Sequence, residues 1–277
     1  MDCILETIGF IGGGNMARAL ATCFIEKGIV DAKKIWVSSR TENTLQKWIP
    51  LGVNTTLVNG EVIKKSNVVF LTIKPQVLDA VIEDVCQFLE SKTYLDKVFV
   101  SVLAGIPITR LKLKLEEITI NPRIVRAMPN TPVTLGEGII VYCLDGTNSS
   151  DGVLIEKLFS CTGLTEIVPE SLINALSALC GSGPAFAYLM IEALSDGAVK
   201  MGVPRGLATK FSSQVLIGAG KMVQKTEKHP GQLKDEVCSP GGTTICGMHE
   251  LENGSVRASI INAIEATVKK ADSLAPK

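Results

Sequence analysis

The stretch Ile8-Gly9-Phe10-Ile11-Gly12-Gly13-Gly14-Asn15-Met16-Ala17 decides the expected fold, because it joins a strand pattern, a glycine turn and the start of a helix. Gly12, Gly14 and Ala17 fit the pattern G-x-G-x-x-A. The first glycine of that pattern permits a tight turn, and the second lets the backbone approach a pyrophosphate. The pyrophosphate would lie at the helix start, where free N–H groups and the helix dipole favour an anion. We therefore expect a dinucleotide site that includes Gly12, Gly13, Gly14, Asn15 and Met16.

Short β-branched runs and helical patterns alternate over the first half of the chain. Strands are expected at residues 7–11, 34–38, 68–73, 98–102, 123–128 and 139–143, and helices at 15–27 and 76–88. The run from Val68 to Ile73 is apolar on both faces, as a strand covered by helices on both sides must be. The alternation predicts an α/β fold with a parallel sheet, and it favours a nucleotide site over a merely structural glycine turn. We place a Rossmann-type nucleotide-binding domain at residues 1–168.

Only helical patterns follow Pro169. Helices are expected at residues 171–180, 185–200, 205–223, 243–253 and 255–273, which predicts an all-α domain at residues 169–277. Glycines lower helix propensity unless close packing compensates, and these segments contain Gly197, Gly218 and Gly220 beside the small residues Ala193, Ala198 and Ala219. Packing between the helices of two subunits would compensate, so we expect a homodimer.

The composition argues against several classes of protein. The 277 residues are 46% hydrophobic with 28 basic and 28 acidic residues, so we expect a globular chain without the basic surface that nucleic acid requires. Gly181 to Pro184 interrupts the uncharged stretch 171–191, and we expect two helices there instead of a membrane span. The acidic N-terminus enters a strand pattern at once and shows no signal peptide, which favours a cytoplasmic location. Eight scattered cysteines lack zinc-ligand spacing, so we expect reduced thiols and no metal site.

Two residues after the second expected strand bear on the choice of cofactor. In folds that prefer NAD, an acidic residue at this place binds the ribose 2′-hydroxyl. This chain has Ser39 and Arg40 instead, and a hydroxyl with a guanidinium can bind the 2′-phosphate that a carboxylate would repel. We therefore predict NADP(H), with NAD(H) as a weaker alternative. The other interpretation is that Arg40 is a solvated loop residue.

A second candidate site lies near the C-terminus, in the segment Ser239-Pro240-Gly241-Gly242-Thr243-Thr244. A turn of this composition that opens a helix presents consecutive N–H groups and hydroxyls to one point, which suits a small carboxylate. A helix cap and turn without a ligand is the alternative.

Taken together, these segments resemble the pyrroline-5-carboxylate reductase family over nearly the whole chain. The matching pieces are residues 9–17, 73–75, 101–105, 126–132, 181–185, 196–204 and 229–244, the last of which is similar to the family signature. The resemblance implies NAD(P)H-dependent reduction of 1-pyrroline-5-carboxylate to L-proline, the final step of proline biosynthesis. It also implies a Rossmann domain followed by a helical dimerisation domain, with dimers assembled in some relatives into a ring such as a decamer.

The resemblance also implies roles for single residues. The cofactor contacts would be Ser39 and Asn59 at the adenosine phosphate, with Ile73, Lys74, Pro75, Ala104, Gly105 and Asn130 toward the nicotinamide. The substrate pocket would consist of Glu227, Val237, Ser239, Gly242, Thr243 and Thr244. Thr244 is the candidate catalytic residue, with its hydroxyl facing the ring nitrogen. Cys238 departs from a second serine that relatives often carry, which matters little if Ser239 contacts the carboxylate.

Hydride transfer to an imine requires few ionisable groups, because an imine that is already protonated accepts a hydride readily. Accordingly, we interpret His229 and His249 as turn or surface residues and not as catalysts. One rival class is a β-hydroxyacid dehydrogenase, which would need an active-site lysine and a glycine-rich substrate loop that Gly181 to Pro184 imitates only loosely. Another is a nucleotide-sensing protein without catalysis.

Overall fold

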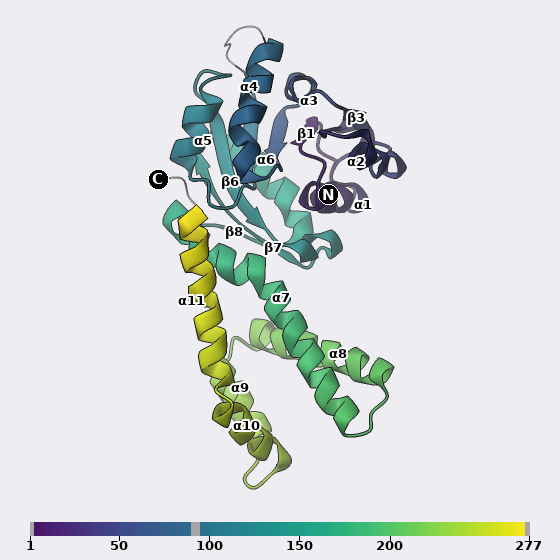
Figure 1. Cartoon of the computed structure of the whole chain (residues 1–277), viewed down its shortest axis with the longest axis vertical. Coiled ribbons are helices and arrows are strands. Elements are labelled where there is room, and N and C mark those ends of the chain that lie inside the picture. Colours follow the sequence, from purple (N-terminus) through teal and green to yellow (C-terminus); the bar gives the residue numbers. More distant parts are fainter. Residues whose placement is uncertain (1–2, 90–94, 275–277) are drawn as a thin grey trace. The chain divides into compact units, whose positions relative to one another are not determined.

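The computed structural model describes residues 3–89 and 95–274, which divide into two compact units. Unit 1 comprises residues 1–182 and 268–277, and unit 2 comprises residues 183–267. Unit 1 contains an eight-stranded sheet with helices on both faces, so the expected α/β nucleotide-binding fold is confirmed (Figure 1).

The strand order of this sheet is β3-β2-β1-β4-β5-β6-β7-β8, and the order reverses beside β1, between β1 and β4. The strands are β1 (Ile8–Ile11), β2 (Ile35–Ser38), β3 (Asn54–Thr56), β4 (Val68–Leu71), β5 (Val98–Ser101), β6 (Arg123–Pro129), β7 (Gly138–Asp145) and β8 (Gly163–Ile167). The pairs from β3 through β6 are all parallel, so their carboxyl ends share one edge of the sheet. Ligands of such sheets bind at that edge, near the point where the strand order reverses.

The sequence had predicted a parallel sheet, but the sheet is not parallel throughout. Strand β7 runs antiparallel to β6. Residues 130–137, which include the 3₁₀ helix η4 (Thr131–Leu135), join the two strands, and this segment is too short for the crossover that a parallel pair needs.

The helices of unit 1 bury one apolar side each against the sheet. These helices are α1 (Asn15–Glu26), α2 (Glu42–Gln46), α3 (Asn59–Lys65), α4 (Leu78–Leu89), α5 (Ile108–Leu115) and α6 (Ser149–Phe159), with short 3₁₀ helices η1 (Ala32–Lys34), η2 (Ile49–Leu51), η3 (Pro75–Val77) and η5 (Ser160–Thr162). One buried cluster joins α1 and α6 to the sheet through Phe24, Phe70 and Phe159. A second cluster joins α3, α4 and α5 through Val62, Ile82 and Leu111. Two packed faces explain why a central strand such as β4 is apolar and buried at every residue.

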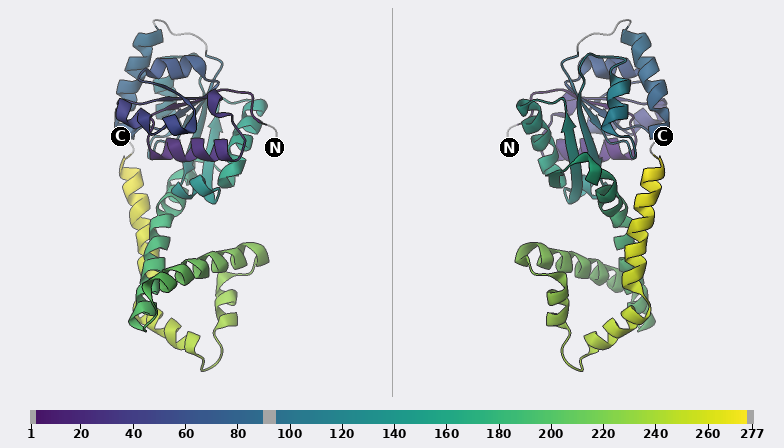
Figure 2. Two further views of the ribbon diagram at one scale, coloured as in Figure 1. Left: turned by 90° about the vertical axis from the view of Figure 1, so that its right-hand side faces the viewer. Right: turned by 90° about the vertical axis from the view of Figure 1, so that its left-hand side faces the viewer.

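Helix α7 (Glu170–Lys200) corrects a prediction. The sequence predicted two helices separated at residues 181–184, but one continuous helix includes Pro184 (Figure 2). The missing N–H of a helical proline leaves the carbonyl four residues earlier without its usual donor. Here that carbonyl belongs to Cys180, and it accepts a hydrogen bond from Asn130 Nδ2 at 3.0 Å.

Unit 2 consists of helices and connecting loops in its described residues, as predicted. Its elements are the second part of α7, α8 (Arg205–Thr226), α9 (Pro230–Val237), α10 (Thr243–Asn253) and most of α11 (Val256–Leu274). Helix α10 has the predicted bounds, whereas α9 was not predicted.

Unit 2 lacks an apolar core of its own in the part of the chain that the structure describes. The three buried apolar clusters consist of unit 1 residues. Large apolar side chains of unit 2 are instead more than a third exposed, among them Tyr188, Leu189, Phe211, Val215, Ile217 and Ile261. Helices with this much exposed apolar surface require a partner surface to cover it.

Helix α7 is also long and apolar enough to cross a membrane by length and composition, with 17% of its most hydropathic window buried. The expectation of no membrane span had relied on a break at Gly181 to Pro184, and the structure removes that argument. The alternative explanation for its apolar surface is a second subunit packed against it.

Two buried cysteines of unit 1 lie together, with 3.8 Å between Cys23 Sγ and Cys161 Sγ. Burial raises the pKa of the Cys161 thiol to about 12 and that of Cys143 to about 11. These thiols are therefore protonated at neutral pH, and all eight cysteines are free.

Candidate active site

The glycine loop of unit 1 connects β1 to α1 at the carboxyl edge of the sheet. Gly12 has a φ of +102°, which L side chains rarely adopt, and a Cβ there would lie 2.8 Å from the carbonyl oxygen of Thr72. Gly14 is the N-cap of α1 and makes no side-chain cap bond. A Cβ at Gly14 would have nothing within 4 Å, so the space above the helix start is open.

The carbonyl groups of this loop are held by side chains behind it. Thr72 Oγ1 donates to Gly12 O at 2.7 Å, and Ile11 O, 3.0 Å from the same hydroxyl, accepts from Thr72 N at 2.9 Å. Trp48 Nε1 donates to Gly13 O at 3.0 Å. Because the carbonyls point toward these donors, the N–H groups at the start of α1 are left available to an anion.

The sequence had not identified Thr72 or Trp48 as site residues. Thr72 could have been found from the expected sheet, because it directly follows β4 and β4 pairs with β1 so that Leu71 lies opposite Ile11. Trp48 lies 35 residues from Gly13 and carries no motif, so only the fold brings it to the loop.

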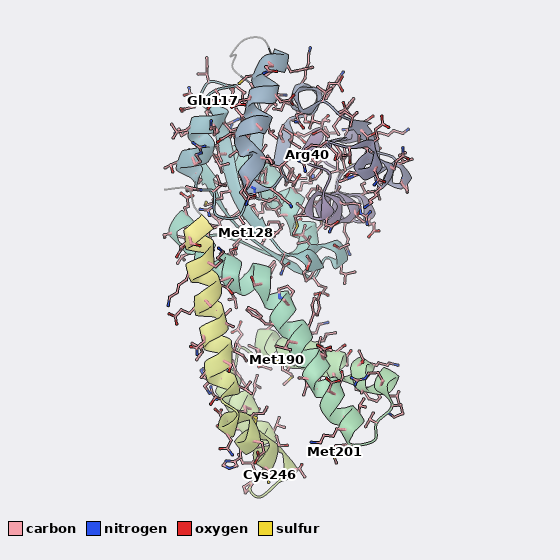
Figure 3. The ribbon with its side chains drawn as sticks, viewed as in Figure 1. Arg40, Glu117, Met128, Met190, Met201 and Cys246 are labelled. Atoms are coloured by element: carbon pink, nitrogen blue, oxygen red, sulfur yellow. The ribbon has the colours of Figure 1, made fainter. Side chains whose placement is uncertain are left out.

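Three predicted adenosine-phosphate residues lie around the carboxyl end of β2. Ser39 and Arg40 follow that strand directly, and Arg40 is exposed (Figure 3). Asn59 begins α3, where its Oδ1 accepts from Ser38 Oγ at 2.7 Å. Asp84 Oδ2 accepts from Asn59 Nδ2 at 3.0 Å. Ser38 and Asp84 therefore orient Asn59, a role that the sequence did not predict.

The residues predicted near the nicotinamide follow neighbouring strands along the same edge. Ile73, Lys74 and Pro75 come after β4, and Ala104 and Gly105 come after β5. The side chains of Ile73 and Pro75 are partly buried, whereas Lys74 and Ala104 are exposed.

Asn130, which follows β6, is 5% exposed and both ends of its amide are occupied within the protein. Nδ2 donates to Cys180 O at 3.0 Å, and Oδ1 accepts from Ile139 N at 2.9 Å. These two bonds give Asn130 a structural role that the sequence did not indicate.

In unit 2, the turn from Ser239 to Gly242 leads directly into α10. Gly242 N donates to Ser239 O at 3.0 Å, and Gly242 is the N-cap of α10 without a side-chain cap bond. A Cβ built on Gly242 would clash with Ser239 Oγ, so this hydroxyl lies over the helix start. Thr243 and Thr244 are the first two residues of α10. The turn thus brings a hydroxyl and free helical N–H groups together, as a carboxylate site requires.

Glu227 and Val237 lie at the carboxyl ends of α8 and α9. Glu227 is the C-cap of α8 in the left-handed conformation, with a φ of +55°. Glycine is favoured at such a position, and another residue costs about 1–2 kcal/mol. Val237 is 65% exposed.

Neither histidine has an arrangement typical of an acid or base catalyst. His229 is the N-cap of α9, and its Nδ1 accepts a hydrogen bond from Gly231 N at 3.1 Å. His249 lies exposed on α10. The interpretation of His229 as a turn residue agrees with this cap.

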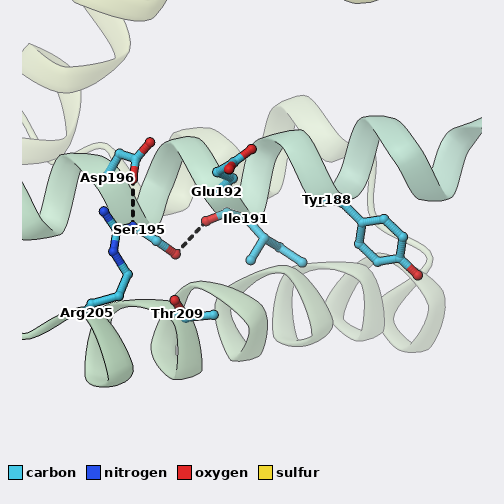
Figure 4. Close-up of a pocket in the computed structure, with 7 residues that line it drawn as sticks. All are labelled: Tyr188, Ile191, Glu192, Ser195, Asp196, Arg205 and Thr209. Atoms are coloured by element: carbon cyan, nitrogen blue, oxygen red, sulfur yellow. Dashed lines mark hydrogen bonds and ion pairs between the residues drawn. The ribbon is translucent and has the colours of Figure 1, made fainter.

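A separate cavity of about 440 Å³ lies between α7 and α8 (Figure 4). The Asp196 carboxylate in it pairs with Arg205 NH1 at 2.6 Å, and Ser195 Oγ donates to Ile191 O at 2.7 Å. Asp196 is therefore paired within unit 2, in an ion pair whose two side chains are more than half exposed. The cavity contains none of the predicted site residues.

The residues of unit 1 fit a bound dinucleotide. The open space above Gly14 would hold the pyrophosphate against the start of α1, and Gly12 leaves no room for a side chain. Ser39, Arg40 and Asn59 would hold the adenosine end beside β2. The sheet order and the glycine loop together define a dinucleotide-binding domain of the Rossmann type. Its match to an NADP oxidoreductase family model places the chain among the oxidoreductases that use this nucleotide.

Comparisons with known proteins define the family. Residues 7–105 match the family model described as NADP oxidoreductase, coenzyme F420-dependent, and residues 170–274 match that of pyrroline-5-carboxylate reductase dimerisation. The chain is 43% identical to human pyrroline-5-carboxylate reductase 2 over 94% of this chain and 81% of the relative. It is 41% identical to pyrroline-5-carboxylate reductase of Arabidopsis thaliana over 96% of this chain and 95% of the relative. The chain belongs to the pyrroline-5-carboxylate reductase family.

Solved structures agree with this membership. The Plasmodium falciparum pyrroline carboxylate reductase with NADP bound superposes with a TM-score of 0.86 at 29% identity, covering 99% of this chain and 100% of that one. The Coxiella burnetii pyrroline-5-carboxylate reductase gives a TM-score of 0.84 at 33% identity, with 99% and 100% coverage. The predicted fold class and family resemblance are both confirmed.

Proposed function

We propose that this chain reduces 1-pyrroline-5-carboxylate to L-proline with NADPH, the final step of proline biosynthesis. The observation that carries this proposal is the identity of 41–43% to pyrroline-5-carboxylate reductases over at least 94% of the chain. The glycine loop in unit 1 and the turn before α10 in unit 2 support it, because they provide a dinucleotide site and a carboxylate site.

We assign cofactor binding to residues of unit 1 and substrate binding to residues of unit 2. In unit 1, Gly12, Gly13, Gly14, Asn15 and Met16 bind the pyrophosphate, and the residues after β4 and β5 contact the nicotinamide half. In unit 2, Ser239 Oγ and the N–H groups of Thr243 and Thr244 hold the substrate carboxylate, while the N–H of Gly242 closes the turn by donating to Ser239 O. The Thr244 hydroxyl forms a hydrogen bond with the ring nitrogen: it donates to the neutral imine and accepts from the protonated imine. When bound, the reduced nicotinamide supplies the hydride that the imine carbon accepts.

Glu227 and Val237 complete the proposed substrate pocket. The left-handed conformation of Glu227 is less favourable than that of a glycine at the same place, and strained residues of this kind occur often at functional sites. We assign its carboxylate to the imine end of the substrate, where a negative charge favours the protonated imine.

The activity is tested by mixing the pure protein with NADPH and racemic pyrroline-5-carboxylate and following the nicotinamide absorbance. A decrease that depends on both substrates, with proline as the product, supports the proposal. A β-hydroxyacid dehydrogenase would instead oxidise hydroxyacids with NADP, and a nucleotide-sensing protein would bind NADPH without turnover. Either result would remove the proposed activity.

Replacing Arg40 with alanine should weaken binding of NADPH more than binding of NADH, by about 1 to 3 kcal/mol if a charge-assisted phosphate contact is lost. Arg40 is exposed and makes no ion pair within residues 3–89 and 95–274, so its removal leaves no partner behind. Fluorescence titration of both cofactors measures the difference. Equal losses for the two cofactors would leave Arg40 as a solvated loop residue.

Replacing Thr244 with valine should lower kcat with the affinity for NADPH almost unchanged. Valine keeps the shape of the side chain but removes the hydroxyl, and one lost hydrogen bond raises the barrier by about 1 to 3 kcal/mol. His229→Gln and His249→Gln serve as controls and should keep most activity near neutral pH. If a histidine variant folds but is inactive while Thr244→Val keeps its full kcat, the proposed role of Thr244 is wrong and the proton comes from another group.

The assembly and location are also proposals. We propose a homodimer through the segment at residues 170–274, with dimers assembled into a larger ring, and a cytoplasmic location. We also propose residues 169–277 as the functional dimerisation and substrate-binding domain, although the first turns of α7 pack with unit 1.

A further inference from the structure

We infer that Asn130 is a positioning residue that supplies the hydrogen bond which Pro184 removes from α7. In a regular helix, the N–H of residue 184 would donate to the carbonyl of Cys180, but proline has no N–H. The Asn130 Nδ2 group donates to that same carbonyl at 3.0 Å. A side chain from the end of β6 therefore takes the place of a backbone donor in the helix.

The surroundings of Asn130 make this bond specific. The side chain is 5% exposed, and Cys180 is 6% exposed, so water does not readily substitute for either group. Asn130 Oδ1 accepts from Ile139 N at 2.9 Å, at the start of β7. This second bond fixes the orientation of the amide, so that its NH₂ group faces Cys180 and its oxygen faces β7. An unsatisfied carbonyl at this depth would be costly, which explains how a proline is tolerated inside α7.

A second attachment on the same strand supports this interpretation. Arg126 of β6 donates to Glu170 Oε1 and to Asn174 Oδ1, both at 2.8 Å. Strand β6 thus holds α7 at its start through Arg126 and at Cys180 through Asn130. The division between the compact units falls at Ser182 and Gly183, just beyond the second attachment.

The position of this bond connects it to the proposed reaction. Asn130 follows β6 at the sheet edge where the nicotinamide half is proposed to bind, and α7 continues from Cys180 into unit 2. Asn130 therefore fixes the part of α7 that belongs to unit 1 beside this edge of the sheet.

The test is a double-mutant cycle of Asn130→Asp and Pro184→Ala in the full chain. Aspartate keeps the oxygen that accepts from Ile139 N, but its carboxylate has no hydrogen to donate to Cys180 O. Alanine at position 184 restores the backbone N–H that can donate to the same carbonyl. We expect Asn130→Asp alone to lower the midpoint of thermal unfolding and to reduce kcat about tenfold. When Pro184→Ala is also present, both losses should be at least halved.

Asn174→Asp is the matched control, because Asn174 also joins α7 to unit 1 but bonds to Arg126 and to Asp272 Oδ1. Its effects should be equal in the unchanged chain and in the Pro184→Ala chain. If the Asn130→Asp chain does not fold, Asn130→Ser can replace it. Serine also loses the bond from Ile139 N, but this loss is the same with and without Pro184→Ala and therefore cancels in the cycle.

Equal effects of the Asn130 substitution with and without Pro184→Ala would overturn the proposal. A rise in the KM for NADPH that Pro184→Ala leaves unchanged would also overturn it, because it would indicate a direct cofactor contact. The turnover measurement relies on the proposed function, whereas the unfolding measurement does not. Failure of the proposal for Asn130 can therefore be distinguished from failure of the proposed function.

Discussion

Replacing Gly12 with alanine is expected to abolish measurable binding of NADPH and to destabilise the chain by about 2 to 4 kcal/mol. Two effects add at this position. The φ of +102° is unfavourable for alanine, and the new Cβ would lie 2.8 Å from the backbone carbonyl oxygen of Thr72. Relief requires the loop to move away from β4, which would break the bond from Thr72 Oγ1 to Gly12 O and the bond from Thr72 N to Ile11 O. Equilibrium unfolding in urea and fluorescence titration with NADPH measure the two effects.

Gly28→Ala is the control that distinguishes backbone strain at a positive φ from damage to the nucleotide site. Gly28 also has a positive φ, of +68°, but a Cβ there meets nothing within 4 Å. This variant should lose about 1–2 kcal/mol of stability and keep its affinity for NADPH. If Gly12→Ala binds NADPH as tightly as the unchanged chain does, the glycine loop is not the pyrophosphate site.

Replacing Gly218 with leucine is expected to weaken the association of subunits and to remove most activity with it. A Cβ on Gly218 meets nothing within 4 Å of its own chain, so a leucine fits a single subunit. The neighbouring surface of α8 includes Phe211, Val215 and Ile217, which are 59%, 59% and 48% exposed. A partner packed closely there would meet the added side chain, and overpacking of this kind costs about 1–3 kcal/mol at each site. Sedimentation velocity and turnover measured over a range of protein concentrations check this expectation.

Gly152→Leu is the control for that experiment. Gly152 lies in α6 of unit 1, where the nearest atom to a new Cβ is Leu144 Cδ1 at 4.0 Å. Leucine has the same higher helix propensity at both positions, so only the effect on assembly should differ. A Gly218→Leu chain that assembles like the unchanged protein, or an unchanged chain that is a fully active monomer, would contradict the expectation.

The central part of the fold could be predicted from the sequence because its strands are buried on both faces. Strands β1, β2, β4, β5, β6 and β7 were all expected within two residues of their observed ends. The two edge strands β3 and β8 were missed. Residues such as Thr55, Glu166 and Ile167 in these strands are exposed, so neither edge strand carries a continuous apolar pattern.

The helical half was less predictable where a local rule competed with packing. The sequence Gly181 to Pro184 indicated a helix break, and local propensity supports that reading. A bond from Asn130, 50 residues earlier in the chain, keeps the helix continuous. Helix α9 was missed because its eight residues, PGQLKDEV, carry few apolar side chains, although Pro230 at its first position and His229 as its cap are helix-start signals.

The candidate site also contains one part that the sequence predicts and one part that it does not. The glycine loop and the turn before α10 could be found from the sequence because contiguous residues form them. The side chains that orient the loop, Thr72 and Trp48, come from separate elements and carry no motif. Their roles depend on the pairing of β1 with β4 and on the packing of residue 48 behind the loop, which no local pattern specifies.

The bonds from Thr72 and Trp48 to the glycine loop have a thermodynamic consequence for nucleotide binding. Fixing the backbone of one residue costs about 1–2 kcal/mol of conformational entropy, so a loop that ordered only around its ligand would lose affinity by that amount at each residue. Here three successive carbonyls, those of Ile11, Gly12 and Gly13, already have donors in the protein itself. The conformational entropy of the glycine loop is thus lost during folding. The nucleotide then binds a preorganised loop, so the free energy of its contacts is not reduced by the cost of ordering the loop.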